Sequence, residues 1–276
     1  MRKNKTSRSQ VKPKKALGQH FLTDLSVAAR NAATLDSYKG MPVLEVGPGM
    51  GVLTRPLLEA GHDVTVVEID SESVAYLRSH FPEMADGTRI VEGDFLRLDL
   101  AALFPDKKFC VIGNYPYNIS SQIFFHVLDY KDLIPCCSGM LQREVAERIA
   151  AGPGTKTRGI LSVLLQAWYD IEYLFTVSEH VFNPPPKVKS GVIKMTRNSV
   201  TSLGCDEALF KTVVKTTFGQ RRKTIRNSVR SLLPAGATIA DSELLAMRPE
   251  QLTVQQFITL TNLVTSARTN ASNNQG

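Results

Sequence analysis

Short apolar runs alternate with helix-like segments from residue 41 to about residue 197, and this alternation constrains the fold more than any other feature. Strand-like runs occupy residues 42–46 (PVLEV), 63–70 (DVTVVEID), 88–95 (TRIVEGDF), 108–117 (KFCVIGNYPY) and 136–142 (CCSGMLQ). Amphipathic segments such as VLTRPLLEA and SESVAYLRSHF separate them. Near-continuous apolar strands joined by helices indicate a parallel sheet covered on both faces. We therefore predict an α/β fold with a Rossmann-like sheet.

After residue 197 the strand signals stop, and four helical patterns follow at residues 206–218, 221–233, 241–247 and 253–264. The polar ends of the chain lack periodicity. We predict four parts: a disordered basic tail (1–12), an α/β domain (13–197), a small all-helical domain (198–266) and a disordered tail (267–276).

The composition excludes several classes of protein. No run of eighteen apolar residues is present, which argues against a transmembrane helix, and the basic N-terminus lacks the apolar segment of a signal peptide. We expect a cytoplasmic protein without a membrane partner. The four cysteines form no CxxC pair and no His/Cys ligand pattern, so we expect reduced core residues and no metal.

A glycine-rich loop follows the first strand of the alternating region. Gly47, Gly49 and Gly51 stand between a strand and a helix, where glycine lets the backbone turn sharply and approach a ligand. The second strand ends at Glu68, the position of the ribose-binding carboxylate in doubly wound folds. Asp94 ends the third strand, where its carboxylate can accept a hydrogen bond from an adenine amino group.

The spacing of these glycines indicates which kind of nucleotide ligand the loop can bind. It is GxGxG, whereas dinucleotide enzymes carry GxGxxG, and no phosphate-binding basic residue follows. The set therefore favours S-adenosylmethionine as cofactor. The alternative is that both carboxylates merely cap strand ends, which is competitive for either residue alone but not for the ordered set.

The fourth strand runs into GNYPYNISS, at the sheet edge where open α/β sheets bind ligands. An adenine N6 is a poor nucleophile because its lone pair is delocalised into the ring. The side-chain oxygen of Asn114 and a backbone carbonyl, which we assign to Tyr115, can accept the two amine hydrogens and direct the lone pair at a methyl donor. Tyr117 offers a face on which the base can stack.

NYPYNIS resembles the signature of the rRNA adenine N6-dimethyltransferases. So do KKALGQHFL, LEVGPGMGVLT, MLQREVAERI, FNPPPKVKSGVI, FGQRRKTIRNSV and RPEQLTVQQF, in the order of that family and from about residue 12 to residue 263. The resemblance implies a class I methyltransferase sheet with an S-adenosylmethionine-binding catalytic domain. It also implies that the donor is contacted by the following residues: His20, Leu22, Gly47, Glu68, Asp94 and Asn114.

On the acceptor side, the resemblance implies that Tyr117 and Phe182 enclose a flipped adenine, because the amine cannot be reached inside a stacked helix. Read by itself, Phe182 is equally compatible with a core position. Two positions depart from the family, which usually has Asn where this chain has His20 and Leu where it has Tyr115.

Basic residues are concentrated in two segments. Residues 1–23 hold seven Lys and Arg without an acid, which leaves 26 basic and 26 acidic residues in the rest of the chain, and residues 208–240 hold seven more without an acid. The second segment carries a predicted helical stripe that we assign to RNA binding: Arg222, Lys223, Arg226 and Arg230. A solvated helix face is the alternative.

The patterns predict an S-adenosylmethionine-dependent RNA methyltransferase. The family resemblance implies that it dimethylates N6 of two adjacent adenosines near the 3′ end of 16S rRNA during biogenesis of the small ribosomal subunit. We expect it to act as a monomer on rRNA in that subunit. Dimethylation of 23S rRNA, as in macrolide resistance, and a binding role in subunit assembly are the alternatives.

Overall fold

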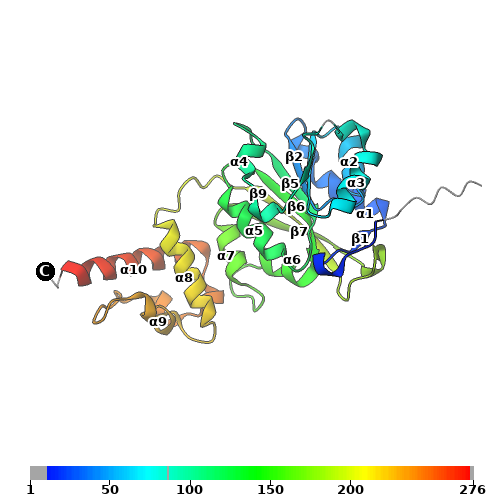
Figure 1. Cartoon of the computed structure of the whole chain (residues 1–276). Coiled ribbons are helices and arrows are strands. Elements are labelled where there is room, and N and C mark those ends of the chain that lie inside the picture. Colours follow the sequence, from blue (N-terminus) through cyan, green and yellow to red (C-terminus); the bar gives the residue numbers. More distant parts are fainter. Residues whose placement is uncertain (1–10, 86, 274–276) are drawn as a thin grey trace, which may run out of the picture. The chain divides into compact units, whose positions relative to one another are not determined.

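The computed structural model describes residues 11–85 and 87–273. Its main sheet has seven strands in the order β4-β3-β2-β5-β6-β9-β7 (Figure 1). The strands are β2 (Val43–Val46), β3 (Val64–Glu68), β4 (Ile90–Glu92), β5 (Cys110–Asn114), β6 (Cys136–Gln142), β7 (Tyr169–Val177) and β9 (Ser190–Arg197). Parallel pairs join β4-β3-β2-β5-β6, as the alternation of strands and helices predicts.

Helices cover this part of the sheet on both faces, and strands such as β2 are therefore buried along their whole length. In Figure 1, α1 (Leu25–Ala32), α2 (Thr54–Glu59) and α3 (Ser71–His80) lie on one side and α5 (Ser120–Asp129) on the other. Leu57 of α2 and Leu77 of α3 share a hydrophobic cluster with Val66 and Ile112 of the strands. The short helix α4 (Leu100–Leu103) precedes β5.

A second, two-stranded sheet ties the N-terminal segment to a distant part of the chain. Strand β1 (Phe21–Leu22) pairs antiparallel with β8 (Phe182–Asn183), with Phe21 opposite Asn183 and Leu22 opposite Phe182. Leu22 and Phe182 are both buried in one hydrophobic cluster. This pairing fixes the N-terminal segment beside the ends of the main strands.

The chain divides into two compact units, residues 1–143 with 174–194, and residues 144–173 with 195–276. The second unit contains α6 (Arg143–Ala150) from its second residue on, α7 (Ile160–Gln166), α8 (Glu207–Gly219), α9 (Ile225–Ser228) and α10 (Val254–Asn273). Residues 198–273 contain helices and no strand. The division differs from the predicted boundary at residue 197, because α6 and α7 group with the C-terminal helices.

The structure corrects the predicted C-terminal tail. Helix α10 continues through residues 267–273, where we expected disorder. Ala267 is buried, and the Arg268 guanidinium donates a hydrogen bond from Nε to the Leu232 carbonyl over 2.8 Å. Tertiary contacts therefore continue the helix into the predicted tail. Residues 274–276 and 1–10 of the predicted tails lie outside the described residues, and Val11 is buried.

The prediction of one continuous helix over residues 221–233 is also wrong. The structure has a turn at residues 221–223, the four-residue helix α9 and a 3-10 turn at Arg230–Leu232. Arg222 and Lys223 would place positive charge in the first turn of a longer helix, where the helix dipole disfavours it.

Candidate active site

A cavity of about 380 Å³ lies at the carboxyl ends of the central strands, within the range of small-molecule sites. Five segments supply most of its lining: residues 16–22, 45–50, 67–69, 93–96 and 114–119. The lining includes seven of the predicted site residues: His20, Leu22, Gly47, Glu68, Asp94, Asn114 and Tyr117. Strand ends and the N-terminal segment thus converge on one cavity.

The carboxylate of Glu68, at the end of β3, is oriented by backbone amides. One oxygen accepts from the Gly49 amide and the other from the Asp70 amide, each over 3.0 Å. Burial raises the pKa of Glu68, and these two hydrogen bonds partly oppose that shift. A carboxylate has about four lone-pair directions, so Glu68 retains acceptor capacity for a hydroxyl of a ligand.

The glycine loop lies against the N-terminal segment. Gly49 has a φ of +56°, and a Cβ there would come within 2.8 Å of the Phe21 ring. A side chain at Gly49 would therefore be strained and would push this ring away. The loop thus meets both the Glu68 carboxylate and Phe21.

Asp94 follows β4 and begins a short 3-10 turn. Its Oδ1 accepts from the Leu96 amide over 3.0 Å, and its Oδ2 lies 3.5 Å from the exposed Arg97 guanidinium. Asp94 is therefore a cap, as the alternative interpretation had it, and it also lines the cavity. The two roles are compatible because Oδ2 accepts no backbone hydrogen bond among the described residues.

Asn114 ends β5 with its amide held by the N-terminal segment. Its Nδ2 donates to the His20 carbonyl over 3.1 Å. In this orientation the amide oxygen is the atom left for another partner, and an oxygen is what an amine donor requires.

Tyr117 is fixed at its hydroxyl, which lies 2.6 Å from the Ser190 hydroxyl. Burial raises the pKa of Tyr117, so the phenol stays neutral at physiological pH. The ring stacks with that of His20 at a centroid distance of 5.5 Å and an interplanar angle of 29°.

Phe182 is the predicted site residue that the structure does not bring to the cavity. Its side chain is 4% exposed and packs with Leu22, Met140 and Val192. It lies directly opposite Leu22, which does line the cavity. The predicted stacking role of Phe182 stays a prediction.

Tyr115, which stands where the family usually has Leu, belongs to the core. It is 1% exposed, and its hydroxyl donates to the Ser138 carbonyl over 2.6 Å. A Cβ at Gly139 would lie 2.7 Å from the ring, so this glycine provides the space that the larger side chain needs.

Two buried polar residues of the cavity were not singled out from the sequence. Glu45, inside β2, accepts from the Thr54 hydroxyl over 2.6 Å, and burial raises its pKa to about 8. Asn31 of α1 is fully buried, and its amide has no hydrogen-bond partner among the described residues. Glu45 lies in the quoted LEVGPGMGVLT segment, where only the glycines drew attention, and Asn31 lies in a segment that no quoted motif covers.

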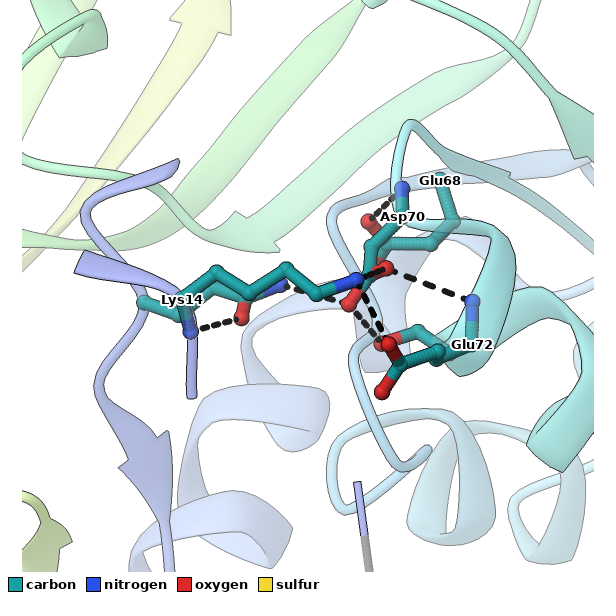
Figure 2. A network of polar contacts seen from close by, with 6 residues as sticks. Lys14, Glu68, Asp70 and Glu72 are labelled. Atoms are coloured by element: carbon teal, nitrogen blue, oxygen red, sulfur yellow. Dashed lines mark hydrogen bonds and ion pairs between the residues drawn. The ribbon is translucent and has the colours of Figure 1, made fainter. Parts of the chain in front are cut away.

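A polar network anchors the N-terminal segment beside Glu68. Figure 2 shows Lys14 reaching towards Asp70 and Glu72. Its ammonium lies 2.5 Å from an Asp70 oxygen and 3.1 Å from a Glu72 oxygen, and Gln19 donates to Asp70 over 3.3 Å. Burial alone would raise the pKa of Asp70, but the hydrogen bonds from Lys14 and Gln19 lower it. The Asp70 amide in turn bonds to Glu68.

The predicted RNA-binding residues lie in the second compact unit and are all exposed: Arg222, Lys223, Arg226 and Arg230. They do not form one helical stripe, because only Arg226 lies in α9. Arg226 pairs with Asp241 over 2.8 Å, so an acid lies beside the segment in space although none lies within it.

Neither a metal site nor a membrane span is found in the described part of the chain. Residues 11–85 and 87–273 contain no cluster of three or more His, Cys, Asp or Glu that could hold a metal. None of their helices is long and apolar enough to cross a membrane.

Comparison with known proteins identifies relatives along nearly the whole chain. The ribosomal RNA adenine dimethylase family matches residues 10–266. A protein of Parabacteroides distasonis is 70% identical over 251 residues, which cover 91% of this chain and 93% of the relative. One of Flavobacterium johnsoniae is 56% identical over 256 residues, 92% of this chain and 97% of the relative. Both are named ribosomal RNA small subunit methyltransferase A.

Two solved structures share the fold. A dimethyladenosine transferase from Plasmodium falciparum has a TM-score of 0.73 at 21% identity and covers 90% of this chain and 98% of its own. The 23S rRNA methyltransferase ErmE has a TM-score of 0.62 at 24% identity, with 89% and 99% covered. These likenesses confirm the predicted α/β class I methyltransferase fold.

Proposed function

We propose that this chain, which belongs to the ribosomal RNA adenine dimethylase family, is an enzyme of small-subunit biogenesis. It dimethylates N6 of two adjacent adenosines near the 3′ end of 16S rRNA. One observation carries the proposal: the Asn114 amide is held with its oxygen free at the cavity that Glu68 and Asp94 also line. The names of relatives that are 56–70% identical support an RNA of the small subunit as substrate.

The residues of the cavity fit S-adenosylmethionine, which supplies an electrophilic methyl group when bound. Glu68 accepts hydrogen bonds from ribose hydroxyls with the lone pairs that Gly49 and Asp70 leave free. Asp94 accepts from the adenine amino group of the donor. Gly47 lets the backbone approach the donor closely, and Leu22 closes the cavity from the N-terminal segment.

The acceptor amine is held by Asn114 and the Tyr115 carbonyl. Each oxygen accepts one amine hydrogen, which draws the nitrogen towards tetrahedral geometry and directs its lone pair at the methyl group. No strong base would be required beforehand, since a methylated amine would carry a positive charge and lose its proton to water. Tyr117 stacks on the flipped base, and Phe182 covers the opposite face after leaving its buried position.

The basic residues Arg222, Lys223, Arg226 and Arg230 dock the RNA through its phosphates. Their exposure supports this role, because phosphate contacts require cations at the surface. The cavity is lined by residues of a single compact unit, which supports action as a monomer. We place the reaction in the cytoplasm, with the assembling subunit.

The proposal is tested by incubating the protein and labelled donor with small and large subunits that lack the methylation, followed by mapping of the modified base. Label should enter two adjacent adenosines of the small-subunit rRNA. Label confined to large-subunit rRNA would instead identify a 23S rRNA enzyme. Tight binding to the small subunit without label would identify an assembly factor.

A further inference from the structure

His20 makes three contacts that lead towards the acceptor side of the cavity. Its ring Nδ1 lies 2.8 Å from the Pro184 carbonyl, its ring stacks with Tyr117, and its own carbonyl accepts from the Asn114 amide. A carbonyl oxygen can only accept, so Nδ1 carries the proton in the first contact.

The register of the small sheet shows what holds this ring. Phe21 lies opposite Asn183 and Leu22 opposite Phe182, so the same antiparallel register places His20 opposite Pro184. The hydrogen bond from Nδ1 to Pro184 continues this pairing by one residue. The imidazole is therefore anchored to the β1–β8 pair and independently of the acceptor loop.

Tyr117 is in turn fixed at two places. Its hydroxyl meets Ser190, and its ring meets His20. A base inserted between two rings requires about 7 Å, two contacts of ~3.5 Å each. The two ring centroids are 5.5 Å apart, so the target base has no room between them. It must use the face of Tyr117 that His20 leaves open.

We propose that His20 is a positioning residue for the target adenine. Its imidazole supports one face of Tyr117 and thereby presents the other face to the base, while its carbonyl turns the Asn114 oxygen towards the amine. This inference rests on the proposed function and assigns the side chain to the acceptor, where the family resemblance assigns it to the donor.

Three substitutions distinguish the contribution of the His20 ring from that of its hydrogen bond to Pro184. His20→Ala removes both, His20→Gln keeps a donor for Pro184 without a ring, and His20→Phe keeps a ring without the donor. All three retain the carbonyl that holds Asn114. His80→Ala is a matched control, because His80 also stacks on a tyrosine, Tyr76, and also has Nδ1 2.9 Å from a carbonyl, but it does not line the cavity.

The measurements are KM and kcat with unmethylated small subunits, and the Kd of S-adenosylmethionine by calorimetry. A stacked aromatic pair corresponds to roughly a 2- to 10-fold effect. We expect His20→Ala and His20→Gln to raise KM for the subunit by about that factor, and His20→Phe to recover most of the loss. The donor Kd should change by less than about 2-fold throughout. His80→Ala should resemble the wild type.

Three outcomes would overturn the inference: an increase in donor Kd with an unchanged KM for the subunit, rescue by Gln but not by Phe, or no change in His20→Ala. Thermal unfolding of each variant identifies a folding defect, and the His20→Phe comparison remains decisive if His20→Ala is unstable. Methylation by the wild type is read first in the same assay, so failure of the proposed function is seen separately.

Discussion

Glu45 places an ionisable group inside the central strand β2, where burial raises its pKa to about 8. Between the ordinary value of 4.5 and about 8, the folded protein keeps a proton that the unfolded chain has released. The free energy of unfolding therefore falls as pH rises through that window and levels off above it. The loss is on the order of a few kcal/mol, at about 1.4 kcal/mol per pKa unit.

Urea unfolding at pH 5 and pH 8 checks this prediction. Glu45→Gln can keep the hydrogen bond with Thr54 and should remove most of the difference in stability between the two pH values. The buried Glu68 is shifted in the same direction and accounts for part of the remainder. An undiminished pH difference in Glu45→Gln would refute the assignment.

Replacing Asn31 is predicted to raise the free energy of unfolding, whereas most core substitutions lower it. A buried amide without partners costs about 1–3 kcal/mol, and Leu has the same number and branching of side-chain heavy atoms without that cost. Asn31→Leu should therefore raise the free energy of unfolding of the donor-free protein by about 1 kcal/mol or more. Asn31→Ala is the control for lost packing. A lower stability of Asn31→Leu in urea unfolding would show that the amide is satisfied in solution.

At the residue scale, the sequence predicts best where a side chain directly follows a strand. Glu68 and Asn114 end two parallel strands and Asp94 comes just after a third, and parallel strands end at one sheet edge. The position of Phe182 depends on two-residue strands that carry no periodic signal. The position of Tyr115 depends on Gly139, far away in sequence. Neither could be derived from local pattern.

At the scale of elements, the N-terminal segment, residues 14–22, makes a contact that can be tested separately. Lys14 ties it to Asp70 and Glu72, and because its side chain is 38% exposed, solvent screens the ion pair. Lys14→Met should speed dissociation of the donor by roughly 2- to 5-fold, measured by stopped flow. The effect should shrink at high salt, which already weakens the pair.

Lys12→Met is the matched control, because Lys12 is exposed and has no ion pair among the described residues. Equal dissociation rates for the wild type and Lys14→Met at low salt would show that the segment does not retain the donor.

The basic segment around α9 is the second element with a separable role. Reversing Arg222, Arg226 and Arg230 to Glu should weaken RNA binding and flatten its salt dependence, since each lost phosphate contact removes about 0.7–0.9 from the slope. Donor affinity should be unchanged, because the cavity lies in the other compact unit.

Reversal of the exposed Lys107 and Lys108 serves as a control for net charge. If RNA affinity at moderate salt were the same in the α9 variant and the wild type, the docking role would be lost.

Elements with a strong hydrophobic periodicity were predicted well, whereas elements whose lengths depend on tertiary contacts were not. The parallel strands follow from their apolar runs. A longer α9 would begin with Arg222 and Lys223, which the helix dipole disfavours. Helix α10 continues past residue 266, where Ala267 is buried and Arg268 donates a hydrogen bond to the Leu232 carbonyl. Helical propensity alone did not indicate either length.

For the whole molecule, the cavity and the predicted RNA-docking residues lie in different compact units. Substitutions in each unit should therefore impair one step and spare the other. This separation makes Asn114 the sharpest test, because it is the residue assigned to the reacting amine.

The most direct measurement is the amount of N6,N6-dimethyladenosine, by mass spectrometry, in rRNA of small subunits treated with the wild type or with Asn114→Ala. Removing one preorganised hydrogen-bonding group at a reacting atom typically costs about 10²- to 10³-fold in rate. The wild type should produce dimethyladenosine and Asn114→Ala almost none, with subunit binding retained. Equal amounts of dimethyladenosine from both proteins would contradict the role assigned to Asn114 and the mechanism built on it.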